Sequence, residues 1–260
     1  HLDGAALGIH ETRPRLSWRL PRGAMEQRAY EVELGDGRTA RFESPHHVLV
    51  PWPFEPLRSR ETASWRVRVL TESGTSSWSD PASLETGLLE PADWQARWIE
   101  PHEPEPFPSG ERPVYVLRHE FEVDDKHEGT ERPARLYATA CGIYETFLNG
   151  RRVGDLELTP GFTTYPATLQ VQTYDVTNLL SQGTNRWTVL LSDGWFRGRH
   201  GIDQRADNYG TTVAFLGQIS VGPSTVATGP DWMSTTGPIR HADLMAGQYE
   251  DRRVVDGPWN

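Results

Sequence analysis

The sequence predicts an all-β protein made of two β-sandwich domains. In many short runs, apolar residues occupy every second position, which is the spacing of a strand with one buried face. We find no stretch of three or four turns that carries apolar residues at helical spacing. Glycine and proline, at 24 and 20 of the 260 residues, separate the runs as they do in sandwiches. This length suits two domains of ordinary size.

The first domain is expected over residues 1–90. Apolar side chains alternate with polar ones over residues 16–20, 30–34 and 65–69. Near its end, residues 72–74 (Glu-Ser-Gly) have the chemistry of a turn between two strands. Together these segments give roughly six or seven candidate strands, at the spacing of a sandwich.

The second domain is expected over residues 91–260. An Asn149-Gly150 pair lies between two apolar runs, and Asn-Gly suits the two positive-φ positions of a type I′ turn. We therefore expect a hairpin tip there. The candidate strands of this domain share the alternating pattern, and they cover residues 115–123, 134–148, 186–191 and 211–222.

Two segments of the second domain are expected to lack strand. Residues 101–113, "PHEPEPFPSGERP", are rich in proline, which cannot complete a ladder, and we expect an acidic, solvated surface loop. Asp175 and Thr177 are candidate caps for one short helical turn.

Composition excludes several classes of function. The formal net charge is -10, which argues against nucleic-acid binding. No apolar stretch approaches 18 residues, so no membrane span is expected. Cys141 is the single cysteine, which rules out an intramolecular disulfide and a cysteine-based metal site. We expect a small buried thiol at Cys141, no cofactor and no bound metal. The sequence does not indicate an oligomeric state.

The lone cysteine and the lack of a signal-like segment favour a cytoplasmic protein. A secreted protein whose signal peptide has been removed is the alternative. The chain starts without Met, which suggests a piece of something longer.

One motif, "SDGWFRGRHG", follows an alternating strand and carries the candidate functional residues. These are Asp193, Trp195, Arg197, Arg199 and, downstream, Tyr209. In a sugar-binding loop, the Trp ring would stack on a sugar face while Arg and Asp bind hydroxyls. In a packed corner, the glycines would allow a sharp turn and the arginines would pair with acids of another domain. The packed corner is favoured because large aromatic side chains are mostly buried.

No catalytic constellation is recognisable. The chain has no glycine-rich phosphate loop, no HExxH and no GxSxG motif. A glycosidase needs two carboxylates across a cleft, and the 36 acidic residues do not single out such a pair.

Long segments resemble the bacterial α-L-rhamnosidases of glycoside hydrolase family 78. The opening "LGIHETRPRLSWRL" resembles the start of these enzymes, and "SWRVRVLTESGTSSWSDPASLETGLLEPADWQARWI" is similar to the end of their fibronectin type III-like domain. Residues 136–201 are similar to their N-terminal jelly-roll, galactose-binding-like domain. The tail "DLMAGQYEDRR" follows the family pattern except at Gln248, where a Glu is usual. The shorter ordered patterns are residues 142–145, 149–150, 160–163, 174–177 and 194–198.

The resemblance implies that the parent protein is an inverting glycosidase that hydrolyses terminal α-L-rhamnosyl residues of glycosides. In the family, an (α/α)₆ barrel follows these two domains and carries the catalytic acids. We expect this chain, which runs to Asn260, to stop short of that barrel and to be inactive alone. Its expected role is to support or dock the catalytic domain and to help shape the substrate cleft. No catalytic residue of the family can be assigned here.

Two alternatives stay open. The chain could act alone as a carbohydrate-binding module through the jelly-roll loops. It could also be an interaction or adhesion protein built on the fibronectin-like domain. The expected partners are the chain's own catalytic domain and, through the full-length enzyme, rhamnose-containing glycosides.

Overall fold

The computed structural model describes residues 5–24, 26–104, 107–124, 133–254, 257 and 259. The chain forms two compact units, His1–Trp94 and Gln95–Asn260, each described by itself below. The described residues are nearly all strand, turn and loop, which confirms the predicted all-β class. No helix in the described part combines the length and apolar character that a membrane crossing needs.

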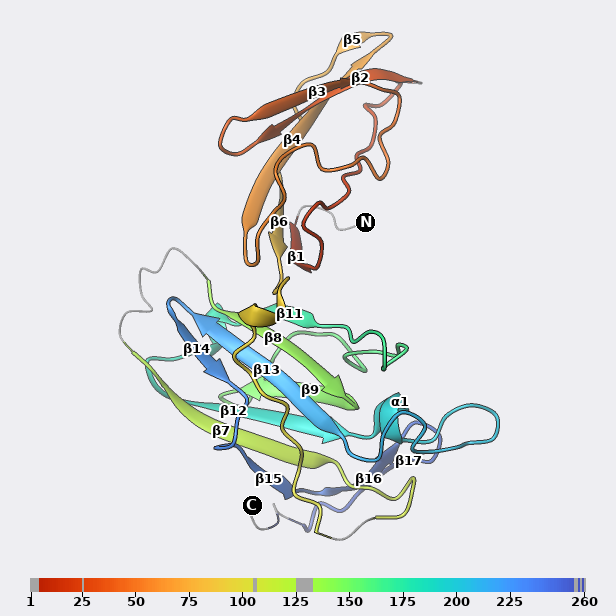
Figure 1. Ribbon diagram of the computed structural model, residues 1–260, viewed down its shortest axis with the longest axis vertical. Helices are drawn as coiled ribbons and strands as arrows, with labels where there is room; N and C mark the ends of the chain where they lie inside the picture. The colour runs from red at the N-terminus through yellow and green to blue at the C-terminus, as the bar shows by residue number, and fades with distance from the viewer. Residues whose placement is uncertain are drawn as a thin grey trace. The chain divides into compact units, whose positions relative to one another are not determined.

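Unit 1 is organised around one sheet with the strand order β1-β6-β4-β2-β3, and β5 pairs with the far end of β4. The predicted alternation at residues 30–34 and 65–69 lies on the paired strands β2 and β4 (Figure 1). The strands of the unit are β1 (Ala5–Ile9), β2 (Gln27–Leu34), β3 (Thr39–Glu43), β4 (Thr62–Thr71), β5 (Gly74–Thr75) and β6 (Ala82–Thr86).

The other layer of unit 1 consists of irregular segments. The strand expected at residues 16–20 is reduced to a single antiparallel bridge between Leu16 and Val50. Leu49, opposite it, has a φ of +53°, which bends the partner segment away from a continuous ladder. Leu16 is nevertheless buried in the core of the unit and Trp18 packs against that core, so the apolar pattern predicted their burial correctly and the strand wrongly.

Unit 2 is a sandwich of a five-stranded sheet, β10-β9-β12-β7-β15, and a four-stranded sheet, β11-β8-β13-β14, with a separate hairpin β16-β17 (Figure 1). The strands are β7 (Tyr115–Val123), β8 (Arg135–Cys141), β9 (Ile143–Leu148), β10 (Arg151–Arg152), β11 (Gln172–Asp175), β12 (Gly183–Ser192), β13 (Ala214–Val221), β14 (Ser224–Ala227), β15 (Met233–Thr236), β16 (Ile239–Asp243) and β17 (Gly247–Glu250).

The core of unit 2 lies between the two sheets. Trp187 on β12 and Tyr144 on β9 meet Phe215 on β13, with ring centroids 6.1 and 5.3 Å apart. The indole nitrogen of Trp187 donates a 2.7 Å hydrogen bond to the hydroxyl of Thr146, so its one polar group is satisfied. Alternate residues of these strands therefore face inward, as their period-two patterns predict.

The Asn149-Gly150 hairpin is confirmed. The two residues have φ values of +53° and +78°, and they join β9 to β10 with Leu148 paired to Arg151. The Asn149 side chain also donates to the side-chain oxygen of Asn185 at 2.8 Å, which ties the turn to β12.

Substitution of Gly150 by Val is expected to destabilise unit 2 by about 1 kcal/mol or more, because a β-branched residue resists positive φ. A Cβ atom at Gly150 would meet no heavy atom within 4 Å, so the cost is confined to the backbone. This corresponds to a fall of about 2–4 °C in Tm, measured by thermal unfolding. Gly150→Asn is the matched control, since Asn tolerates this conformation. Equal melting temperatures for the Gly150→Val variant and the wild-type protein would contradict the prediction.

Candidate functional site

The "SDGWFRGRHG" motif forms a tight turn at one end of unit 2. The strand β12 ends at Ser192, and the chain then makes one helical turn, α1 (Gly194–Arg197). Gly194 has a φ of +53°, and a Cβ atom there would lie 2.5 Å from Cγ1 of Ile143. A glycine is therefore required both by the backbone conformation and by the close approach of β9.

The side chains of Asp193 and Arg197 point into the protein, where they are 1% and 2% exposed. Nη2 of Arg197 donates a 2.6 Å hydrogen bond to Glu103, and its Nε lies 3.4 Å from Oδ1 of Asp193. Nη1 of Arg112 lies 3.2 Å from Oδ2 of Asp193. The motif thus pairs with residues of its own unit.

Arg112 extends this arrangement to the loop that follows α1. Its Nη1 lies 3.0 Å from Oδ1 of Asp207 and also donates to the backbone carbonyl of Arg197. The backbone N–H of Asp207 donates to that same carbonyl at 2.9 Å. We call the five residues the buried ionic network: Glu103, Arg112, Asp193, Arg197 and Asp207.

Burial and pairing act in opposite directions on the acids of the network. Burial alone would raise the pKa of Glu103, but hydrogen bonds from Arg197 and Tyr115 outweigh it and lower the pKa. For Asp193, burial dominates and raises the pKa, although the guanidinium groups of Arg197 and Arg112 oppose the shift. Burial and the neighbouring Glu103 also raise the pKa of Tyr115, so its phenol stays protonated.

Over its described residues, 101–104 and 107–113, the proline-rich stretch is a loop without strand, as expected, but it is not solvated throughout. It brings Glu103 and Arg112 into the buried ionic network, and the Ser109 carbonyl accepts a hydrogen bond from Arg199. Prolines remove ladder hydrogen bonds but do not prevent burial of the charged side chains between them. The ionic partners lie far away in the sequence, so the local pattern could not reveal them.

Arg199 connects the turn to two other segments. Its guanidinium reaches the Ser109 carbonyl, and its backbone N–H donates to Oδ2 of Asp243 on β16 at 2.9 Å. Figure 1 shows α1 and the β16-β17 hairpin at the same end of unit 2.

Six rings, three of them from residues 195–200 of the motif, pack into an aromatic cluster. The ring of Phe162 is 52% exposed and lies 6.1–6.2 Å from Trp195, His200 and Tyr209. His200 and Tyr209 are stacked with an interplanar angle of 6°. The aromatic cluster consists of Phe162, Tyr165, Trp195, Phe196, His200 and Tyr209.

The structure therefore divides the five candidate residues into two groups. Asp193 and Arg197 are internal, and a ligand could reach them only if the network opened. Trp195 and Tyr209 are half-buried within the aromatic cluster, and half-buried Arg199 holds two neighbouring segments. Sequence reasoning missed Glu103, Arg112 and Phe162. For Phe162 a signal was present, since it lies in the family-like pattern at residues 160–163.

A groove of about 570 Å³ lies beside the turn, and two carboxylates, Glu145 and Asp243, are among its lining residues. Asp243 accepts hydrogen bonds from the backbone N–H groups of Arg199, Met245 and Ala246, and these outweigh burial and lower its pKa. Glu145 accepts a 3.3 Å hydrogen bond from Arg152. A general acid requires a raised pKa, whereas that of Asp243 is lowered.

Two further kinds of reactive centre, a nucleophilic thiol and a metal cluster, find no support among the described residues. Burial raises the pKa of the Cys141 thiol, which disfavours the nucleophilic thiolate. No three His, Cys, Asp or Glu side chains within the described ranges lie close enough together to hold a metal ion.

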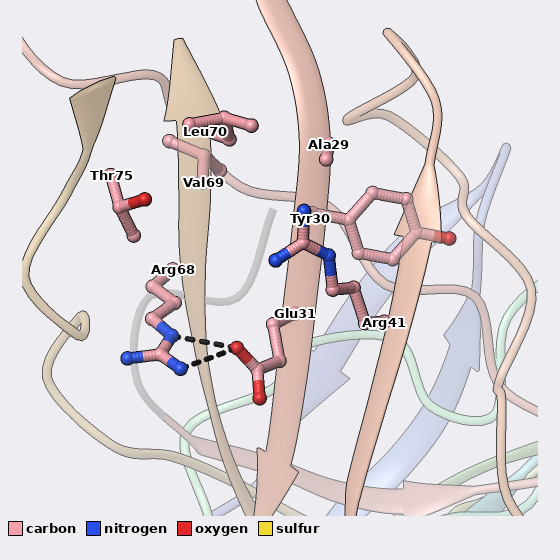
Figure 2. A pocket seen from close by; sticks show the side chains of 8 residues that line it. All are labelled: Ala29, Tyr30, Glu31, Arg41, Arg68, Val69, Leu70 and Thr75. Atoms are coloured by element: carbon pink, nitrogen blue, oxygen red, sulfur yellow. Dashed lines mark hydrogen bonds and ion pairs between the residues drawn. The ribbon is translucent and has the colours of Figure 1, made fainter. Parts of the chain in front are cut away.

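A notch on unit 1 is too small for a sugar. It lies between β2, β3, β4 and β5, with Glu31 and Arg68 paired at 2.6 Å beside it (Figure 2). Its volume is about 20 Å³, which is enough for a water molecule but far below that of a ligand pocket.

Two family models match the chain. The "Alpha-L-rhamnosidase N-terminal domain" model matches residues 130–260, and the "Rha78A-like, N-terminal immunoglobulin domain" model matches residues 1–90. The second description agrees with the fibronectin type III-like expectation in architecture, since both domain types are β-sandwiches.

Longer proteins contain the same region. An alpha-L-rhamnosidase of Alteromonas sp. (strain LOR) is 30% identical over 98% of this chain and 30% of its own length. The crystal structure of an Aspergillus terreus α-L-rhamnosidase superposes with a TM-score of 0.85 at 40% identity, covering 96% of this chain and 30% of that chain. A Streptomyces avermitilis alpha-L-rhamnosidase, solved with L-rhamnose, shares the fold with a TM-score of 0.82 at 22% identity, over 97% of this chain and 43% of that chain. The chain thus spans about 30% of the length of the first of these relatives.

Substitution of Glu103 by Gln is expected to destabilise unit 2 by about 2 kcal/mol at pH 7, because it removes a charged partner of Arg197. The pKa of Glu103 is lowered in the folded state, so its ionised form stabilises unit 2 above the ordinary Glu pKa of 4.5. That stabilisation is lost as the pH falls through the lowered pKa. The difference in free energy of unfolding between the wild-type protein and the variant should therefore become smaller in acid, as measured by urea unfolding at several pH values.

The control for this prediction is Glu120→Gln. Glu120 pairs with Arg186 on the surface at 3.0 Å, where both side chains are about half exposed. Its loss should cost no more than about 0.5 kcal/mol. Equal costs for the two variants, or a gap that does not change with pH, would show that the network does not depend on the charge of Glu103.

Proposed function

The chain belongs to the α-L-rhamnosidase family through the N-terminal domain that it matches over residues 130–260, and from this premise we propose that it is the non-catalytic part of a rhamnosidase. In this proposal the whole enzyme hydrolyses terminal α-L-rhamnosyl residues of glycosides. The role of the chain is to support and dock the catalytic domain. The observation that carries the proposal is coverage: almost all of this chain corresponds to less than a third of the Aspergillus terreus enzyme.

The chemistry of the described carboxylates supports a non-catalytic role. An inverting glycosidase needs a protonated general acid and an ionised base roughly 6.5–9.5 Å apart across a substrate cleft. Asp193, which has a raised pKa, is buried between two arginines and is 1% exposed. The two carboxylates that line the groove are held by hydrogen bonds to Arg152 and to backbone N–H groups.

The isolated chain is expected not to hydrolyse 4-nitrophenyl α-L-rhamnopyranoside, because Asp193, whose pKa is raised, is buried away from substrate, and the carboxylates that line the groove are held by Arg152 and by backbone N–H groups. Release of 4-nitrophenol over hours, at enzyme concentrations in the micromolar range, is the measurement. A purified catalytically active relative serves as the positive control. Turnover that disappears in Glu145→Gln or Asp243→Asn would refute the proposal.

Carbohydrate binding by the aromatic cluster is the second candidate function. Its supporting observation is the exposed ring of Phe162 beside the half-buried rings of Trp195 and Tyr209. Exposed aromatic faces can stack on sugar rings, although the amide nitrogen of Asn208 nearby already bonds His200 and the carbonyl of Arg205. Docking is favoured because Asp193 and Arg197, the polar groups that a sugar would need, are committed to the buried ionic network.

Titration with L-rhamnose and with a rhamnosylated oligosaccharide separates the two functions. Under the docking proposal, tryptophan fluorescence of the chain should show no saturable change up to millimolar sugar. D-Glucose controls for nonspecific effects. Saturable quenching that is lost in both Trp195→Ala and Phe162→Ala would instead establish the aromatic cluster as a sugar site.

A further inference from the structure

The outward face of the five-stranded sheet carries two apolar side chains, beside Glu145 and Ser192, at the end near α1. In an antiparallel sheet that covers a core on one side, the other face normally carries polar side chains. Here Ile143 on β9 and Leu190 on β12 point outward, because the inward positions beside them are the buried Tyr144 and Leu191. These two outward side chains form part of the floor of the groove of about 570 Å³ described above.

Two segments form the walls of this groove. One is the loop of residues 154–160, which contributes Leu158, and the other is the β16-β17 hairpin, which contributes Leu244. The hairpin is fixed to the end of β7, since the N–H of Val114 donates to the carbonyl of Ile239 at 3.2 Å. Both walls thus belong to unit 2, and we call the whole feature the sheet groove.

The loop that carries Leu158 is held firmly. Thr159 is buried, its carbonyl accepts from the N–H of Tyr144 at 2.9 Å, and its hydroxyl donates to the Tyr144 carbonyl at 2.8 Å. Nη2 of Arg152 donates to the carbonyl of Leu156 at 3.0 Å. The loop is therefore preorganised rather than free to fold its leucines inward.

Within this rigid loop, Leu158 is unfavourably placed for the chain alone. Its φ is +56°, a conformation that a γ-branched residue without a polar side chain seldom adopts, and its side chain is 48% exposed. Two more leucines are exposed here. Leu156 lies two residues before Leu158 in the same loop, and Leu244 lies on the opposite wall of the groove. A strained backbone that holds an apolar side chain in solvent indicates a surface that a partner covers.

We propose that the sheet groove is the docking surface for an apolar segment of the catalytic portion of the same polypeptide, an inference that rests on the proposed function. The charge pattern supports an uncharged occupant. Among the residues that the structure describes, no Lys or Arg side chain lines the groove, and its two carboxylates already accept hydrogen bonds from Arg152 and from backbone N–H groups. An apolar segment leaves no charge unpaired there, whereas an acidic segment would be repelled.

The size of the groove favours a tethered partner over a second copy of the chain. Fourteen residues line it, while a stable interface between separate proteins takes roughly 20–30 residues a side. A covalently linked partner needs less contact, because the linkage supplies a high effective concentration. In the Aspergillus terreus structure the matching region is 30% of one polypeptide, so such a linked partner exists in that relative.

Hydroxyl-radical labelling tests the proposal by comparing this chain with the full polypeptide encoded by its reading frame. Labelling of Leu158 and Leu244 is expected to fall at least fivefold in the full polypeptide. Ile202 is fully exposed and lies outside the groove lining, so it is the internal reference and should label equally in both.

The matched variants are Leu158→Asp, Leu244→Asp and, as control, Ile202→Asp. In the full polypeptide, each groove variant should raise the labelling of the remaining groove leucine to its level in the isolated chain. The Ile202 variant should leave the labelling of both leucines low. Two groove variants are used so that a folding defect in one does not decide the result.

Equal labelling of Leu158 in both proteins would overturn the docking surface, even if the full polypeptide hydrolyses rhamnosides. Absence of α-L-rhamnosidase activity in a folded full polypeptide would overturn the proposed function instead, so the two failures are distinguishable. A reading frame without a further domain would overturn both. Protection of Leu158 in the isolated chain, accompanied by a dimer in light scattering, would replace the linked segment with a second copy.

Discussion

The guanidinium of Arg197, buried between the carboxylates of Asp193 and Glu103, is the interaction on which one end of unit 2 depends. Arg197 is the last residue of α1, so its position sets the orientation of that turn. Glu103 comes from the proline-rich stretch, and Arg112 of the same stretch reaches both Asp193 and Asp207. The two guanidinium groups of Arg197 and Arg112 therefore help to hold three segments together: the proline-rich stretch, the α1 turn and the loop that carries Asp207.

The buried ionic network contributes more to fixing a single arrangement of these segments than to the net free energy of unfolding. Removing charges from water costs several kcal/mol per ion, and pairing in the interior offsets that cost only when the geometry is good. Three carboxylates face two guanidinium groups here, and the raised pKa of Asp193 shows that burial is not fully offset. What the network provides is a unique arrangement, because any other placement of the stretch would leave a buried charge without its partner.

Two surfaces follow from that fixed end. The aromatic cluster rests on the segment between α1 and Tyr209, and its outermost ring, Phe162, comes from the loop after β10. Gly194 and Ile143 both line the sheet groove, and the missing side chain of Gly194 allows the two segments to approach closely there. Arg199 joins the two regions, since its backbone N–H donates to Asp243 beside the turn of the hairpin. A supporting domain needs rigid surfaces of this kind, since a partner can then dock without ordering the loops first.

The sequence alone determined the fold class, the central strands β2, β4, β7, β8, β9, β12 and β13, and the Asn149-Gly150 turn, because period-two alternation and turn chemistry act between near neighbours. The family resemblance, carried by long ordered motifs, indicated the N-terminal region of a rhamnosidase. The alternating pattern did not reveal that residues 16–20 form only a bridge, since the bend at Leu49 lies on the opposing segment. Nor did it reveal the buried ionic network, whose Glu103 and Arg197 are 94 residues apart. Only the tertiary structure decided which acids meet which arginines, because charged residues carry no periodic signal of their partners and their burial depends on contacts across the whole unit.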